Sequence, residues 1–161
     1  MIVRRYKDND LEPIAALFID TVRHVNVQHY SPEQISAWAP RPPDLVHWRK
    51  RVAGLTVWVA ELNGQVIGFC GLGDGGHVDL LYTDYRSQRQ GVARSLYQQV
   101  EAEALRRGTP RLFTEASITA RPFFEKMGFE VIREQQVEVR GVMLQNYAME
   151  KHIALPDPLL T

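Results

Sequence analysis

A short apolar strand, a polar loop and a long amphipathic helix follow one another between Gly75 and Gly108. The strand spans His77 to Thr83, and the loop reads Arg86-Ser-Gln-Arg-Gln-Gly-Val-Ala93. The helix carries one apolar stripe: Val92, Leu96, Val100 and Ala104. A strand that turns tightly into a helix aims free backbone N–H groups and the positive end of the helix dipole at one point. The stretch therefore predicts an anion site, and phosphate is the anion that suits it best.

The loop fits neither of the two common phosphate-binding turns. It lacks the three spaced glycines of a Rossmann turn and the Gly-Lys-Ser/Thr of a Walker loop. Its pattern, Gln88-x-x-Gly91-x-Ala93 after the strand, resembles the Q/R-x-x-G-x-G/A signature of the GCN5-related N-acetyltransferases (GNAT). A second stretch, Glu115 to Glu130, is similar to the other signature of that family, in which a strand end and a short helix precede an aromatic pair and Lys-x-Gly-Phe.

The resemblance implies an α/β fold in a single N-acetyltransferase domain over residues 1–161. The implied sheet is mixed but mostly antiparallel, with about seven strands and helices on both faces. The strands before and after the long helix are expected to splay apart and to admit the pantetheine arm of acetyl-CoA. Residues 56–130 would form the cofactor-binding core, and the helices within residues 8–52 would lie on the acceptor side.

Local patterns predict the remaining elements. A strand over Ile2 to Tyr6 precedes a helix that Asp8 caps, because apolar residues then recur at helical spacing. Ser31-Pro32 predicts a helix start, and Asn63-Gly64 predicts a hairpin. The other expected elements are helices at Leu45 to Val52 and Thr119 to Met127, and strands at Thr56 to Leu62, Val66 to Leu72, Leu112 to Glu115, Glu130 to Glu138 and Val142 to Lys151.

Composition narrows the classes of function. Lys plus Arg and Asp plus Glu number 19 each, so no general positive field attracts nucleic acid. The single cysteine, Cys70, excludes a disulfide framework, and a reducing cytoplasm is expected. No run approaches the roughly 18 apolar residues of a membrane span, and no H-E-x-x-H or similar set predicts a metal. We therefore expect a cytoplasmic protein, monomer or homodimer, without a membrane or nucleic-acid partner.

The resemblance assigns cofactor contacts residue by residue. Backbone groups of Leu81, Tyr82 and Thr83 are expected to align the pantetheine and to polarise the thioester carbonyl. The pyrophosphate is expected to contact the loop and the helix start: Gln88, Arg89, Gln90, Gly91, Val92, Ala93 and Arg94. Solvation of a helix start is the alternative for the two arginines. Ser117 stands where the family often has an asparagine that touches the pantetheine, and a helix N-cap role is its alternative.

Two residues of the strand are candidates for the general base. His77 aligns with the carboxylate that serves as base in the histone-modifying branch of the family. Side chains alternate along a strand, so His77, Asp79 and Leu81 are expected to share one face. A histidine with a pKa of about 6.5 accepts a proton at neutral pH, which ranks His77 before Asp79. Structural roles stay open for both, as a turn hydrogen bond for His77 and a salt bridge for Asp79.

The general acid and the acceptor site are less well defined. The family usually protonates the leaving thiolate with a tyrosine, but Phe124 stands in this place and has no proton to donate. Tyr82 or Tyr147 would replace it, or water would protonate the thiolate. The first helices are expected to line the acceptor pocket, and core packing is the alternative for each of its candidates: His24, Tyr30 and Trp38.

The activity that the resemblance implies is transfer of acetyl from acetyl-CoA to an amine of a small molecule or peptide. Direct attack by the amine needs no protein nucleophile, so the lack of a Ser-His-Asp or Cys-His pattern does not oppose it. Two alternatives stay open: a non-catalytic acyl-CoA sensor or interaction module with the same fold, and a phosphate or nucleotide binder built on the same loop.

Overall fold

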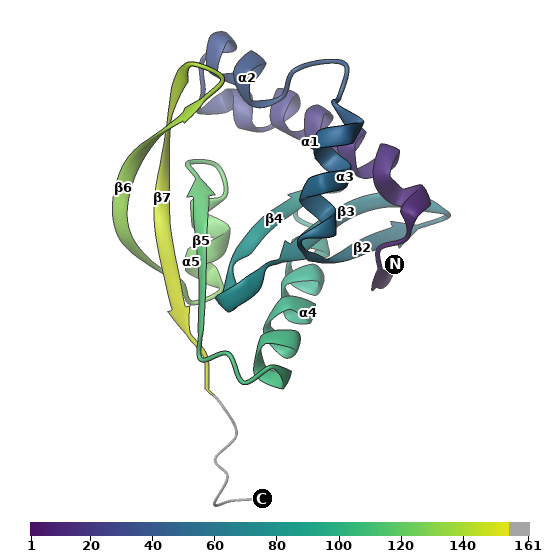
Figure 1. The fold of residues 1–161 in the computed structure, drawn as a ribbon, viewed down its shortest axis with the longest axis vertical. Coiled ribbons are helices and arrows are strands. Elements are labelled where there is room, and N and C mark those ends of the chain that lie inside the picture. Colours follow the sequence, from purple (N-terminus) through teal and green to yellow (C-terminus); the bar gives the residue numbers. More distant parts are fainter. Residues whose placement is uncertain (155–161) are drawn as a thin grey trace, which may run out of the picture.

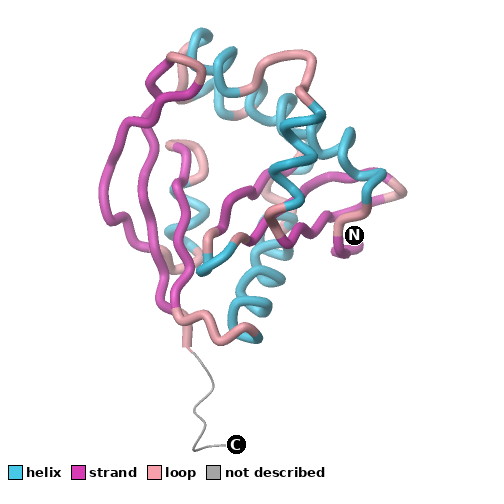
Figure 2. Tube along the Cα trace, viewed as in Figure 1, coloured by secondary structure: helices cyan, strands magenta, loops and turns pink. Residues whose placement is uncertain are grey.

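The protein is built on two antiparallel sheets. The computed structural model describes residues 1–154, and residues 155–161 of the predicted domain lie outside the described residues. The first sheet has the order β1-β2-β3-β4, formed by Ile2–Arg5, Thr56–Leu62, Gln65–Leu72 and Val78–Thr83. The second has the order β5-β7-β6, formed by Arg111–Ser117, Val142–His152 and Glu130–Val139. Figure 2 shows the strands of the two sheets as separate groups.

The two sheets meet at the start of β4 and β5. His77 and Phe113 form an isolated parallel bridge. Beside it, the Thr114 hydroxyl donates a hydrogen bond of 2.8 Å to the carbonyl of Val78. From this junction the two strands diverge, each within its own sheet (Figure 1). The predicted mixed sheet is thus present as two halves, and the predicted splay of the strands on either side of the long helix is confirmed.

Helices cover both faces of the first sheet, as predicted. α1 (Leu11–His24) and α3 (Leu45–Ala53) pack on one face, and α4 (Val92–Arg106) packs on the other (Figure 1). α2 (Pro32–Trp38) lies against β7, and α5 (Arg121–Lys126) lies against β5. The crossover from β4 through α4 to β5 therefore joins the two sheets.

Two hydrophobic clusters fill the space between these layers. The α1 cluster includes Phe18, Trp48 and Phe69, between the first sheet and the helices α1 and α3. The α4 cluster includes Leu96 and Phe124, between α4, α5 and both sheets. The apolar residues of α1 are buried because they recur at helical spacing and face the sheet: Leu11, Ile14, Ala15, Phe18 and Val22. Each large apolar side chain buried in this way contributes about 1.5–3 kcal/mol.

Two short polar side chains begin helices where the sequence predicts. The Ser31 hydroxyl accepts a hydrogen bond of 3.2 Å from the backbone N–H of Gln34 at the start of α2. The Asp44 carboxylate accepts one of 3.1 Å from the N–H of His47 at the start of α3. Each bond satisfies an N–H group that has no partner within the helix.

The predicted cap of α1 at Asp8 is wrong. Residues 8–10 form a 3-10 turn, and α1 begins after it at Leu11. The carboxylate that closes this turn belongs to Asp10, which accepts a hydrogen bond of 2.8 Å from the N–H of Lys7. Asp10 is nearly buried, and its carboxylate pairs with the Arg4 guanidinium at 2.9 Å. This ion pair explains why Asp10, and not Asp8, closes the turn.

Candidate active site

The loop after β4 is folded back onto the end of its own strand. The Gln88 side-chain amide donates a hydrogen bond of 2.8 Å to the carbonyl of Thr83. The Asp84 carboxylate accepts a bond of 2.8 Å from the N–H of Arg86. Arg89 and Gly91 then take positive φ values of 60° and 79°, which turn the chain sharply into α4. The signature glutamine therefore fixes the loop, and the signature glycine provides the left-handed backbone before the helix.

The N-terminus of α4 is open. Its N-cap residue, Gly91, has no side chain to accept the first N–H groups, and the first turn holds no acidic residue. The backbone N–H groups of Val92 and Ala93 consequently have no intrahelical partner and carry the positive end of the helix dipole. Arg89 and Arg94 are exposed beside them, and neither forms a salt bridge within residues 1–154. This geometry suits an anion of two or more negative charges.

The edge of β4 that faces β5 presents free backbone groups. Asp84 N–H binds the carbonyl of Ile67 on β3 at 2.8 Å, whereas the Thr83 carbonyl binds Thr21 and Gln88 instead. Backbone directions alternate along a strand, so Leu81 also directs its N–H and C=O away from β3. The Thr83 side chain is nearly buried and its hydroxyl oxygen has no hydrogen-bond partner. A polar ligand beside β4 would satisfy these groups.

His77 is held at the junction of the two sheets. Its Nε2 lies 2.9 Å from Oε2 of Glu115 on β5. Its ring stacks on Phe113, with 4.7 Å between ring centroids and 6° between the planes. The Glu115 carboxylate raises the pKa of His77 above its ordinary value, although burial acts in the opposite direction.

Asp79 lies at a β-bulge and points toward α3. Gly71 pairs with Leu80 and Leu72 pairs with Val78, so Asp79 is the extra residue of β4. Its carboxylate pairs with the Arg51 guanidinium at 3.1 Å. The bulge breaks the side-chain alternation, because Val78 packs in the α4 cluster whereas Leu80, two residues later, packs in the α1 cluster. Leu81 then packs against the α4 cluster, on the face opposite to Asp79. The predicted common face of His77, Asp79 and Leu81 is therefore wrong.

Comparisons with known proteins agree with this arrangement. A family model described as an acetyltransferase (GNAT) domain matches residues 26–151. The chain belongs to this family. Acetyl transfer is accordingly its reaction class.

Similar proteins cover almost the whole chain. An uncharacterised N-acetyltransferase of Escherichia coli (strain K12), YafP, is 39% identical over 147 residues, which are 91% of this chain and 93% of that protein. A GCN5-related N-acetyltransferase structure from Rhodopseudomonas palustris has a TM-score of 0.91 at 30% identity and covers 94% of this chain and 95% of its own. The Thermoplasma acidophilum PaiA N-acetyltransferase, in complex with coenzyme A, has a TM-score of 0.72 at 17% identity, with 94% and 98% covered, and so shares the fold.

Ser117 and Phe124, the remaining candidates for cofactor contacts, contact residues close to them in the chain. The Ser117 hydroxyl accepts a hydrogen bond of 3.0 Å from the N–H of Ala120 in the turn between β5 and α5. The N-cap residue of α5 is Ala120, so the N-cap alternative for Ser117 is wrong. Phe124 is buried and packs on Phe129 at 5.1 Å between ring centroids. The Phe124 ring therefore packs α5 onto the α4 cluster and offers the cofactor no polar group.

The two candidate hydroxyls for proton donation lie on different layers. Tyr82 packs in the α1 cluster against Phe18, at 4.9 Å between ring centroids, and burial raises its pKa to about 12. Tyr147 accepts a hydrogen bond of 3.0 Å from the Gln145 amide, and the Arg121 guanidinium lies 4.5 Å from its ring centre. A phenol whose pKa is raised holds its proton more tightly, so burial makes Tyr82 the weaker candidate for the general acid.

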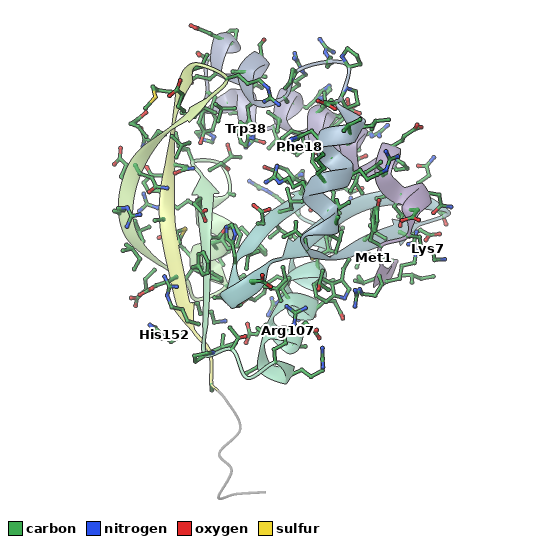
Figure 3. All side chains as sticks on the ribbon, in the orientation of Figure 1. Met1, Lys7, Phe18, Trp38, Arg107 and His152 are labelled. Carbon is green, nitrogen blue, oxygen red and sulfur yellow. The ribbon has the colours of Figure 1, made fainter. Side chains whose placement is uncertain are left out.

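The three predicted acceptor-pocket residues do not share one site. His24 stacks on Tyr85 beside the loop, at 3.9 Å between ring centroids. Trp38 packs edge-on against Tyr30 at 5.2 Å and against Phe18 at 6.4 Å, within the α1 cluster (Figure 3). Tyr30 is 6% exposed. Tyr30 and Trp38 therefore pack in the core, which was the alternative to a place in the acceptor pocket. His24 lies beside the loop that follows β4.

Tyr30 joins three segments through its hydroxyl. The hydroxyl donates a hydrogen bond of 2.7 Å to the carbonyl of Gln145 and accepts one of 2.9 Å from the N–H of Ile118. Replacing Tyr30 by Phe leaves two half-buried backbone groups without this partner, so we expect the free energy of unfolding to fall by about 1–3 kcal/mol in urea titration. Tyr85→Phe is the control, with a change below about 0.5 kcal/mol. Unchanged stability together with a raised KM for the acceptor would instead support the prediction that Tyr30 lines the acceptor pocket.

The sequence reasoning missed Glu115 and Arg51 as partners of the two base candidates. Glu115 lies 38 residues after His77, and Arg51 lies 28 residues before Asp79. Glu115 lies at the exposed position between Thr114 and Ala116 on β5, where a charged residue is ordinary, so the sequence carried no signal for it. Among residues 1–154, no group of His, Cys, Asp and Glu side chains gathers in a way that would hold a metal ion. Within the same residues, no helix is long and apolar enough to cross a membrane.

Proposed function

We propose that this protein is an N-acetyltransferase that transfers acetyl from acetyl-CoA to an amine of a small molecule or peptide by direct attack. The observation that carries the proposal is the open N-terminus of α4 at the end of a strand whose outer edge is unpaired. Residues 56–130 hold the cofactor and residues 8–52 lie on the acceptor side. The enzyme acts as a monomer or homodimer in the cytoplasm, which the single cysteine favours.

The residues around β4 and α4 fit the chemistry of coenzyme A. The N–H groups from Gln88 to Arg94 and the two exposed arginines would hold the pyrophosphate. The outward backbone groups of Leu81 and the unpartnered Thr83 hydroxyl would bind the amides of the pantetheine. Acetyl-CoA supplies an activated acyl group, and these contacts place its carbonyl beside preorganised backbone dipoles.

The base completes the transfer. An amine with a pKa of about 10.4 is mostly protonated at pH 7, so the attacking form must first lose a proton. In the proposal His77 takes this proton, the amine nitrogen bonds to the acetyl carbon, and the C–S bond breaks. The sulfur leaves as a thiolate, which Tyr147 or water protonates. Asp79 is the weaker candidate for the base because the Arg51 guanidinium occupies its carboxylate oxygens.

One observation favours a second candidate function. Phe124 replaces the expected tyrosine and is buried in the α4 cluster, so this position supplies no proton. A GNAT relative that binds acyl-CoA as a sensor or interaction module would not need one. Release of coenzyme A from acetyl-CoA in a screen of amines, amino acids, aminoglycosides and peptides separates the two, because the sensor turns over none of them.

Replacing His77 by Ala tests the base. We expect kcat to fall at least about tenfold, because general base catalysis contributes factors of this size or more. The Kd for acetyl-CoA, measured by calorimetry, should change less than about twofold, since the predicted cofactor contacts come from other residues. His47→Ala is the matched control, because the exposed His47 makes its hydrogen bond through the backbone. Full activity of the His77 variant would remove His77 as the base.

A further inference from the structure

The His77 imidazole is fixed in both position and rotation. Its Nε2 bonds to the Glu115 carboxylate at 2.9 Å, and one face of the ring lies flat on Phe113. The Arg111 guanidinium lies 4.9 Å from the centre of the same phenyl ring and pairs with Glu150. The histidine side chain is 28% exposed, so the bonded and stacked ring remains open to solvent.

From this geometry we infer that Glu115 is a positioning residue, which holds the Nε2–H tautomer of His77 and leaves Nδ1 as the atom that accepts the amine proton. The inference rests on the proposed role of His77 as base. A carboxylate accepts hydrogen bonds and donates none, so the neutral imidazole must carry its proton on Nε2 when it binds Glu115. The lone pair on Nδ1 is then free, since Nδ1 has no hydrogen bond to any residue in 1–154.

Glu115 also stabilises the product of the proton transfer. Once Nδ1 has accepted the amine proton, the imidazolium cation lies against the carboxylate, which favours the charged ring. The other charged groups facing His77 are Asp79 on β4 and Arg51 on α3, and these two largely neutralise each other at 3.1 Å. The Glu115 charge is therefore the one that controls the protonation of His77.

Glu115 is itself exposed, at 42% of its side chain. Its carboxylate therefore reaches His77 from the surface of β5 rather than from the core. A purely structural tie between β4 and β5 would use the same hydrogen bond but would have no effect on proton transfer.

Glu115→Gln separates these roles, because glutamine keeps the shape and removes the charge. Its amide both accepts and donates, so it also permits the other tautomer of His77. In histidine-labelled protein, long-range 1H–15N NMR should show wild-type His77 as the Nε2–H tautomer. In the variant we expect mixed tautomers and a titration midpoint lower by about one pH unit or more. An unchanged tautomer and midpoint would overturn the inference.

Kinetics provide the second readout. Loss of the carboxylate makes His77 neutral at lower pH, so the acidic limb of kcat/KM should move to lower pH by the same interval as the NMR midpoint. The plateau kcat should fall about tenfold, because the variant lacks the carboxylate that stabilises the imidazolium and only part of the ring population offers Nδ1. Glu134→Gln is the matched control, since Glu134 is exposed on the neighbouring β6 and should leave both quantities unchanged. An NMR shift without a shift of the acidic limb would also overturn the inference.

The experiments distinguish a failure of the proposed function from a failure of the inference about Glu115. If His77→Ala keeps full activity, the proposed base is wrong and the inference falls with it. If His77→Ala is inactive while Glu115→Gln leaves the tautomer and midpoint unchanged, the inference alone is wrong. If the wild-type enzyme releases coenzyme A with none of the screened acceptors, the proposed function is wrong.

Discussion

Replacing Gly91 by Glu should weaken acetyl-CoA binding at least about 100-fold, which corresponds to about 2.7 kcal/mol. The residue is the N-cap of α4, and its φ of 79° places it where the chain turns into the helix. A glutamate there adds a negative charge beside the N–H groups that are proposed to hold the pyrophosphate. It also adds a side chain at a position that glycine alone adopts without strain. Isothermal titration with acetyl-CoA measures the effect.

Gly141→Glu is a closely matched control for the same experiment. Gly141 has the same φ of 79°, and a Cβ there would also meet no atom within 4 Å. It lies in the turn between β6 and β7, so its backbone strain and added charge should equal those of the Gly91 variant without touching the loop. Equal loss of affinity in both variants, or unchanged affinity in the Gly91 variant, would refute the proposed pyrophosphate site.

Replacing Gly76 by Ala should lower the free energy of unfolding by about 3 kcal/mol or more. A Cβ on Gly76 would lie 2.0 Å from the Arg111 carbonyl oxygen, and the φ of this glycine is 94°. The obstacle is backbone at the start of β5, so no side-chain rotation relieves it. We expect the two strands to be forced apart at their junction, which also weakens the His77 contact with Phe113.

The neighbouring glycine separates the clash from the backbone strain. Gly75 has a φ of 70°, but a Cβ there would meet no atom within 4 Å. Gly75→Ala should therefore cost only the strain of a left-handed alanine, about 1 kcal/mol. Urea titration of both variants gives the comparison. A similar loss for Gly75→Ala and Gly76→Ala would show that the approach of Arg111 is not what requires glycine at position 76.

Local signals predicted the elements because each depends on neighbours in the chain. The Asn63-Gly64 turn, the Ser31 cap and the apolar stripe of α4 all act within a few residues. The loop around Gly91 was predictable for the same reason. The strand, loop and helix start that form the proposed cofactor side could therefore be located from the sequence.

The features that the sequence did not predict depend on contacts between residues that are far apart in the chain. The bulge at Asp79 depends on how β4 registers against β3, and Glu115 reaches His77 only because β5 lies beside β4. The burial of Tyr30 depends on partners 88 and 115 residues away. No local pattern records such contacts, so the catalytic and acceptor sides were predicted least well.

The single bridge between His77 and Phe113 has a mechanical consequence. The strands β4 and β5 meet only near their starts, at this bridge and at the adjacent Thr114–Val78 hydrogen bond. A change in the angle between the two sheets about this junction therefore displaces the far ends of β4 and β5 most. The loop before α4 lies at such a far end, whereas His77 lies at the pivot. A rotation that widens or narrows the space for a bound acyl chain would thus leave the imidazole almost stationary relative to Glu115.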